Sequence, residues 1–169
     1  MTTPVAPPFT HWPILETRVL TWDDEPACAA FAAGLAAQPG ITAAFITLHG
    51  PLGAGKTTFV RHLLRALGVG GRIKSPSYAI VEPYDLPGGP GAWHFDFYRF
   101  GDPREWEDAG FRDLFASPGL KLVEWPDKAA GLLPTPDLTL SIDLDADGTR
   151  TVHWRAGTPL GADLLAQTD

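Results

Sequence analysis

Eight consecutive residues of this sequence match the spacing of a loop that binds the phosphates of a nucleotide. The stretch Gly50-Pro51-Leu52-Gly53-Ala54-Gly55-Lys56-Thr57 fits the pattern G-x-x-x-x-G-K-[ST] at every fixed position. Glycines have no Cβ and let backbone N–H groups approach an anion, while Lys56 adds a positive charge at the outer phosphates. Thr57 offers a hydroxyl to Mg²⁺, and a helix that starts there points its positive dipole end at the phosphates. The stretch therefore predicts a site for a nucleoside triphosphate.

The flanks of this loop have the order that a phosphate-binding unit needs. The apolar run 43–49 (AAFITLH) predicts a strand before the loop, and 58–67 (TFVRHLLRAL) has its apolar residues at helical spacing. The alternative is a glycine-rich turn that ends in Lys-Thr by chance. The order strand, loop and helix favours the phosphate-binding interpretation over that alternative.

Two carboxylates follow strand-like stretches and are candidates for a magnesium ligand and a water-orienting group. Glu124 ends the stretch 120–124 (LKLVE), and Asp96 follows 92–95 (AWHF). Mg²⁺ prefers oxygen ligands and keeps most of its waters, so a carboxylate at the end of a buried strand is expected to join Thr57. Lys56, Asp96 and Glu124 are the candidate catalytic residues. These residues alone leave open which carboxylate holds the metal and which orients water.

ATP is favoured over a guanine nucleotide. Residues 85–88 (DLPG) match the loose D-x-x-G pattern of GTP-hydrolysing switches, but the prolines and glycines at 87–90 make a hairpin turn the better interpretation. The sequence also contains no Asn-Lys-x-Asp motif for guanine recognition. We therefore expect ATP and Mg²⁺ as the ligands.

The composition predicts one soluble domain without a disulfide or a structural metal. The chain has 169 residues, 44% of them hydrophobic, and no apolar run approaches the ~20 residues that cross a bilayer. The proline-rich start does not resemble a secretory signal, so a cytoplasmic protein with no membrane contact is expected. The single cysteine, Cys28, falls in an alanine-rich helical stretch and is predicted to be a buried thiol without chemistry.

The charge argues against a broad nucleic-acid-binding surface. The formal net charge is −7, whereas such a surface needs an excess of lysine and arginine. Basic residues do gather after the phosphate loop, at Arg61, Arg65, Arg72 and Lys74. This cluster is either a solvated helix face or a contact for phosphates or an acidic partner.

The patterns around the loop predict a three-layer α/β domain with a mixed parallel and antiparallel sheet, of the P-loop NTPase-like kind. An edge strand at 16–22 and a helix from the N-cap Asp24 to about residue 38 precede the loop. One hairpin joins strands at 77–84 and 92–99, and a second joins strands at 138–144 and 149–155.

A single domain is expected to account for nearly the whole chain. We predict a flexible proline-rich tail at 1–13, one P-loop ATPase domain at 14–157 and a C-terminal tail at 158–169.

Four blocks of the sequence together resemble the TsaE family, once called YjeE. They are 50–58 (GPLGAGKTT), 74–78 (KSPSY), 94–99 (HFDFYR) and 122–126 (LVEWP). The phosphate loop alone is generic, whereas the other three blocks in this order are specific to the family. The resemblance covers about residues 21–155. It implies the ATPase subunit of the bacterial machinery that makes threonylcarbamoyladenosine beside the tRNA anticodon, with the carbamoyl-transfer chemistry in other subunits, of the TsaD and TsaB types.

The resemblance also implies roles for single residues. Mg²⁺ would be held by Thr57 and Glu124, Asp96 would lie by the γ-phosphate, and Glu25 and Arg150 would contact the adenine side. The remaining contacts to ATP would come from the loop and the start of its helix: Leu52, Gly53, Ala54, Gly55, Lys56, Thr57 and Thr58. Two departures from the family pattern are Pro51 in place of an acidic residue and Ser77 in place of threonine. Pro51 removes one N–H donor from the loop.

These inferences predict a subunit that binds and hydrolyses ATP to drive the cycling of a tRNA-modifying complex, and that contacts tRNA mainly through its partners. One rival is a small-molecule kinase, which needs an acceptor pocket and usually an arginine-bearing lid; neither has a clear segment here. The other rival is a nucleotide-gated adaptor with negligible hydrolysis. Turnover is expected to be slow without partners, because no segment is assigned to the arginine that contributes ~10³–10⁵-fold in such reactions.

Overall fold

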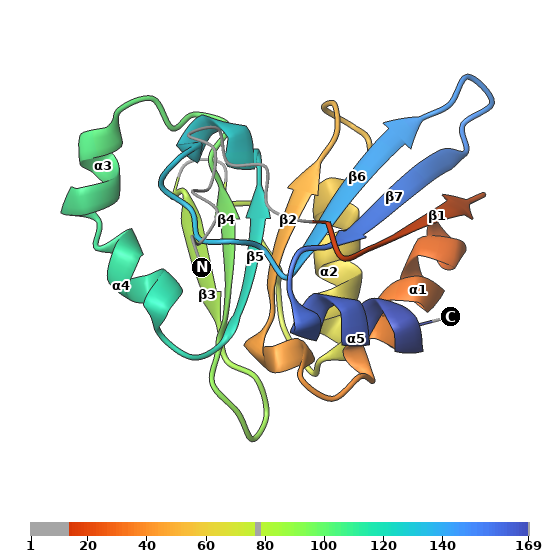
Figure 1. The fold of residues 1–169 in the computed structure, drawn as a ribbon, viewed down its shortest axis with the longest axis horizontal. Helices are drawn as coiled ribbons and strands as arrows, with labels where there is room; N and C mark the ends of the chain where they lie inside the picture. The colour runs from red at the N-terminus through yellow and green to blue at the C-terminus, as the bar shows by residue number, and fades with distance from the viewer. Residues whose placement is uncertain (1–13, 77–78, 169) are drawn as a thin grey trace, which may run out of the picture.

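The computed structural model describes residues 14–76 and 79–168, which form a seven-stranded sheet with helices on both faces (Figure 1). The strand order is β1-β7-β6-β2-β5-β4-β3. The strands are β1 (Glu16–Trp22), β2 (Phe45–His49), β3 (Val81–Tyr84), β4 (Ala92–Asp96), β5 (Leu120–Glu124), β6 (Leu138–Leu144) and β7 (Arg150–Ala156). The α-helices are α1 (Glu25–Ala36), α2 (Lys56–Ala66), α3 (Pro103–Asp108), α4 (Phe111–Ala116) and α5 (Pro159–Gln167). Short 3₁₀ turns lie at Ile41–Ala43 and Pro126–Ala129.

The four strands in the middle of the sheet run parallel. β2 pairs in parallel with β5 and β6, and β4 pairs in parallel with β5. The outer pairs, β3 with β4, β6 with β7 and β7 with β1, are antiparallel. The predicted three-layer α/β architecture, its mixed sheet, both hairpins and the edge position of β1 are therefore confirmed. Because neighbouring parallel strands end at the same edge, the segments that follow β2, β4 and β5 meet there.

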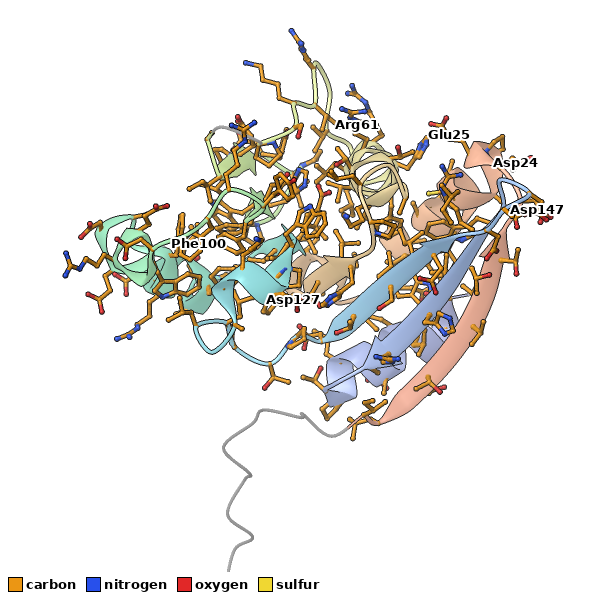
Figure 2. All side chains as sticks on the ribbon, turned by 90° about the horizontal axis from the view of Figure 1, so that it is seen from above. Asp24, Glu25, Arg61, Phe100, Asp127 and Asp147 are labelled. Carbon is orange, nitrogen blue, oxygen red and sulfur yellow. The ribbon has the colours of Figure 1, made fainter. Side chains whose placement is uncertain are left out.

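The two faces of the sheet belong to separate hydrophobic cores. On β2, Ile46 and Leu48 pack with the apolar sides of α1 and α2, whereas Phe45 points to the opposite face. That second core is rich in aromatic side chains from β4 and from the region of α3 and α4. In the view from above, Phe100 lies with this aromatic group, while Arg61 and Glu25 lie on the side of α2 and α1 (Figure 2).

Helix α1 begins where the sequence predicts. The side chain of Asp24 accepts a hydrogen bond of 2.9 Å from the backbone N–H of Ala27, which is N-cap geometry. Cys28 is buried in this helix, as expected, and burial raises the pKa of its thiol to about 12. None of the helices in the described ranges has the length and apolar character needed to cross a membrane.

Residues 158–168 of the predicted C-terminal tail 158–169 pack against the domain instead, so the domain continues beyond residue 157. Residues 159–167 form α5, with Thr158 as N-cap: its hydroxyl accepts a hydrogen bond of 3.1 Å from the N–H of Gly161. Leu164 and Leu165 are buried in the core beside α1. Burial of these leucines stabilises the short helix against the domain. The predicted tail 1–13 lies outside the described residues.

Two strands are shorter than predicted. β3 begins at Val81 rather than residue 77, because Ile80 has a left-handed backbone (φ 68°) that interrupts an extended strand. Ser77 and the following residue lie outside the described ranges. β4 ends at Asp96 instead of continuing to residue 99, because the Asp96 carboxylate accepts the N–H of Tyr98 and turns the chain.

Candidate nucleotide-binding site

The predicted phosphate loop connects β2 to α2 and needs glycine at two positions. Gly55 is the N-cap of α2 with φ 110°, and a Cβ added there would lie 3.1 Å from Nε of Arg150. Gly50 has φ 148°, and a Cβ there would lie 2.7 Å from the carbonyl oxygen of Ile142. Other residue types would therefore be both strained and crowded at these positions. The glycine spacing of the sequence motif follows from this geometry.

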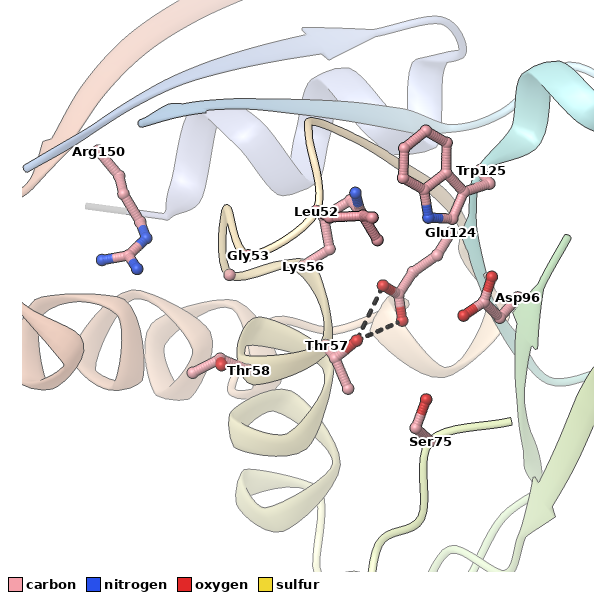
Figure 3. A pocket seen from close by; sticks show the side chains of 11 residues that line it. Leu52, Gly53, Lys56, Thr57, Thr58, Ser75, Asp96, Glu124, Trp125 and Arg150 are labelled. Carbon is pink, nitrogen blue, oxygen red and sulfur yellow. Dashed lines mark hydrogen bonds between the residues drawn. The ribbon is translucent and has the colours of Figure 1, made fainter. Parts of the chain in front are cut away.

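A cavity of about 290 Å³ lies over the loop and brings most of the predicted site residues together (Figure 3). Asp96, Glu124, Trp125 and Ser75 lie on one side of the start of α2, and Arg150 lies on the other. The complete lining consists of Leu52, Gly53, Gly55, Lys56, Thr57, Thr58, Ser75, Asp96, Glu124, Trp125 and Arg150. Its size and its mixture of backbone, cationic and anionic groups suit a polar ligand.

Two of the predicted nucleotide contacts lie outside this cavity. Ala54 is buried, and its carbonyl accepts a 2.6 Å hydrogen bond from Nε of Arg150. Glu25 lines a second pocket of about 180 Å³, which shares Gly55, Thr58 and Arg150 with the first. Glu25 and Arg150 therefore line one pocket beside the loop, and their contact with the adenine side stays a prediction.

Thr57 and Glu124 meet directly. The Thr57 hydroxyl lies 2.9 Å from Oε1 and 3.0 Å from Oε2 of Glu124, which is 2% exposed (Figure 3). In the parallel pairing of β4 and β5, Asp96 is the register partner of Glu124. Burial raises the pKa of Asp96, and the nearby charge of Glu124 adds to this shift, while the N–H of Tyr98 opposes it. Two carboxylates thus stand side by side in one cavity.

Lys56 lies inside the loop. Its ammonium group donates hydrogen bonds to the carbonyls of Gly50 and Pro51, the second at 3.2 Å. It also lies 4.0 Å from the ring centroid of Trp125, within the range of a cation–π contact. Burial lowers the pKa of Lys56, and the charges of Glu124 and Asp96 partly offset this shift. The lysine is therefore fixed beside the cavity by contacts with neutral carbonyls and an aromatic ring.

The oxygen atoms of this site fit a hard divalent cation. A hydroxyl and a carboxylate stand together, which is the donor type that Mg²⁺ prefers. Among the described residues no group of three or more His, Cys, Asp or Glu side chains is arranged to hold a metal. A cation here would have few protein ligands, in agreement with the preference of Mg²⁺ for waters and phosphates over a full protein cage.

Sequence reasoning missed one buried polar residue. Nε2 of His94 lies 2.6 Å from Oε2 of Glu124, and both side chains are almost completely buried. His94 and Asp96 are two residues apart on β4 and so lie on the same face, which is a signal that the sequence contains. The sequence does not show that β4 pairs with β5 in the register that brings this face to Glu124. Ser75 was likewise not singled out, although it lines the cavity.

The fold defines a P-loop NTPase-like α/β protein: a loop with the phosphate-binding sequence pattern lies between a buried parallel strand and a helix, and two neighbouring strands carry carboxylates. The structure is similar to the crystal structure of Bacillus subtilis YdiB, with a TM-score of 0.75 and 27% sequence identity, covering 90% of this chain and 94% of that one.

The sequence comparisons identify the family. Residues 22–152 match the family model described as threonylcarbamoyl adenosine biosynthesis protein TsaE. The tRNA threonylcarbamoyladenosine biosynthesis protein TsaE of Haemophilus influenzae is 41% identical over 124 residues, 73% of this chain and 77% of that protein. The protein of the same name from Bacillus subtilis is 34% identical over 145 residues, 84% of this chain and 85% of that one. The chain belongs to the TsaE family.

Proposed function

We propose that this chain is the ATP-binding and ATP-hydrolysing subunit of the machinery that makes threonylcarbamoyladenosine in tRNA, and that it works in the cytoplasm. The observation that carries the proposal is the meeting of Lys56, the Thr57–Glu124 pair and Asp96 in one cavity. Family membership supports the pathway, because the relatives are named for it. The partners are subunits of the TsaD and TsaB types, which supply the carbamoyl-transfer chemistry and most of the contact with tRNA.

Each residue of the cavity has a role in this proposal. Lys56 and the backbone of the loop bind the phosphates, and Thr57 and Glu124 hold Mg²⁺. Bound Mg²⁺ supplies neutralisation of the negative charge on the phosphates. Asp96 orients a water molecule and accepts its proton, a task for which the pKa raised by burial is favourable at neutral pH. Glu25 and Arg150 contact the adenine side from the second pocket.

The two rival functions remain alternatives that experiments distinguish. A small-molecule kinase would transfer phosphate to an acceptor other than water, and phosphotransfer to candidate acceptors tests it. A nucleotide-gated adaptor would bind ATP through the same cavity with negligible turnover, so turnover with the full set of partners tests that function. The arrangement of the half-buried Asp96 beside Glu124 favours hydrolysis, because an adaptor needs no second carboxylate in the cavity.

The decisive experiment measures steady-state phosphate release by the purified protein alone and with TsaD-type and TsaB-type partners and tRNA. We expect slow turnover alone and strong stimulation by the partners. Lys56→Ala should abolish turnover, because removing a charge-assisted contact costs about 1.5–3 kcal/mol in binding and more in the transition state. The variant should keep the fold. A lone protein that turns over at ~10 s⁻¹ without stimulation would contradict the proposal.

A further inference from the structure

The buried contact between His94 and Glu124 has no role in the function proposed above. His94 is on β4 and Glu124 on β5, so the contact joins two neighbouring strands of the sheet. Their atoms Nε2 and Oε2 lie 2.6 Å apart, and the side chains are 0% and 3% exposed. A carboxylate oxygen accepts, so Nε2 carries the hydrogen and donates it.

We propose that His94 is a positioning residue that holds the Glu124 carboxylate in the orientation that binds Mg²⁺. This inference rests on the proposed function, because it assigns Glu124 as a magnesium ligand. Hydrogen-bond donors behind a ligating carboxylate fix its direction, and their loss typically lowers metal affinity 10- to 100-fold.

Glu124 has two hydrogen-bond donors, and they differ in kind. Thr57 donates to both carboxylate oxygens, but its hydroxyl belongs to the nucleotide site and is itself an expected ligand of the metal. His94 approaches from β4 and lines neither of the two pockets beside the loop. It therefore holds Glu124 independently of whether Thr57 turns toward a ligand.

The surroundings of His94 argue against a purely structural role. Its other ring nitrogen, Nδ1, is buried and has no hydrogen-bond partner among the residues that the structure describes. Trp22 and Trp154 also have an unpaired buried ring nitrogen, but the indole of each packs against aromatic neighbours in the core. An apolar side chain in place of His94 would remove the unpaired nitrogen and suit the buried strand better. The contact that accounts for a histidine in this buried strand is its hydrogen bond to Glu124.

Binding of ADP, followed by calorimetry in EDTA and over a range of Mg²⁺ concentrations, tests the proposal without any turnover. His94→Leu removes the donor at similar volume, and His94→Gln keeps an N–H donor near the position of Nε2. Leu164→Ala, in the buried face of α5, is the control for a general loss of stability. Mg²⁺ is expected to increase the affinity for ADP. We expect His94→Leu to raise the Mg²⁺ concentration that gives half of this increase at least ~10-fold. Affinity in EDTA should stay within ~2-fold of the wild type, and His94→Gln and Leu164→Ala should keep the wild-type Mg²⁺ requirement within ~3-fold.

The outcomes separate this inference from the proposed function. An unchanged Mg²⁺ requirement in His94→Leu, in a protein whose wild type responds to Mg²⁺, overturns the positioning role alone. A glutamine variant as impaired as the leucine variant also overturns it. A wild type whose ADP affinity does not depend on Mg²⁺ overturns both proposals together. If His94→Leu does not fold, His94→Asn replaces it, because the shorter amide does not reach Oε2 and the same loss is expected.

Discussion

Glu124 and Asp96 should have separable roles, although they lie side by side. Glu124→Gln keeps the shape of the side chain: its amide oxygen can accept from His94, and one N–H of its NH₂ group can donate to the Thr57 hydroxyl, so the contacts to both neighbours are kept. The variant therefore loses charge but little folding stability. The loss of a charge-assisted contact is about 1.5–3 kcal/mol, which predicts a ~10- to 100-fold lower affinity for Mg²⁺·nucleotide.

Asp96→Asn should leave binding nearly intact. The asparagine oxygen still accepts the 2.9 Å hydrogen bond from the N–H of Tyr98, so the turn after β4 is kept. Removal of a group that accepts a proton from water should lower turnover ~10²- to 10⁴-fold, while affinity changes less than ~3-fold.

Calorimetry with ADP in Mg²⁺ and in EDTA, together with phosphate release in the presence of partners, measures both effects. In EDTA both variants should bind ADP as tightly as the wild type does. This measurement without Mg²⁺ is the internal control for folding. Equal losses of Mg²⁺-dependent affinity in the glutamine and asparagine variants would refute this division of roles. It would then follow that the two carboxylates hold the metal jointly.

Three further predictions concern single residues that line the two pockets. The ammonium group of Lys56 lies over the Trp125 ring, so nucleotide binding should change the fluorescence of Trp125. Trp125→Phe should remove most of this change, and an unchanged response would show that another tryptophan produces it. Burial raises the pKa of Asp96 in the folded state above its value in the unfolded chain. The ionised carboxylate therefore opposes folding above the folded-state pKa, and this cost fades as the pH falls from that pKa to the unfolded one. Asp96→Asn should therefore raise the melting temperature of the nucleotide-free protein at pH 7 but not at pH 3, and a lower melting temperature at pH 7 would contradict this. Because the pKa of Cys28 is about 12, a thiol reagent at pH 8 should modify it at least ~10³-fold more slowly in the folded than in the urea-unfolded protein, and comparable rates would disprove its burial.

The sequence was sufficient to predict the parts of the site whose geometry is local. The phosphate loop, its strand and its helix are contiguous, and glycine spacing is dictated by backbone geometry within that one segment. Glu124 was recognisable because it ends a predicted strand, and Asp96 because it follows an apolar stretch within one. The contact of His94 with Glu124 was not recognisable, because it depends on which strands pair and in which register, and no local pattern states that. Helix α5 was missed for another reason: Thr158 and Pro159 are ordinary helix-start signals, but the segment is short and its burial depends on distant partners.

The antiparallel hairpin of β6 and β7 is as much a part of the site as the parallel strands. Its residue Arg150 donates to the carbonyl of Ala54 inside the loop and lines both pockets beside it. On the same hairpin, the carbonyl of Ile142 lies close to Gly50, where any Cβ would collide with it. The loop is thus enclosed from one side by the hairpin and from the other by Glu124 and Asp96. A loop whose backbone is supported on both sides keeps its N–H groups oriented before an anion arrives, which reduces the ordering that binding would otherwise require.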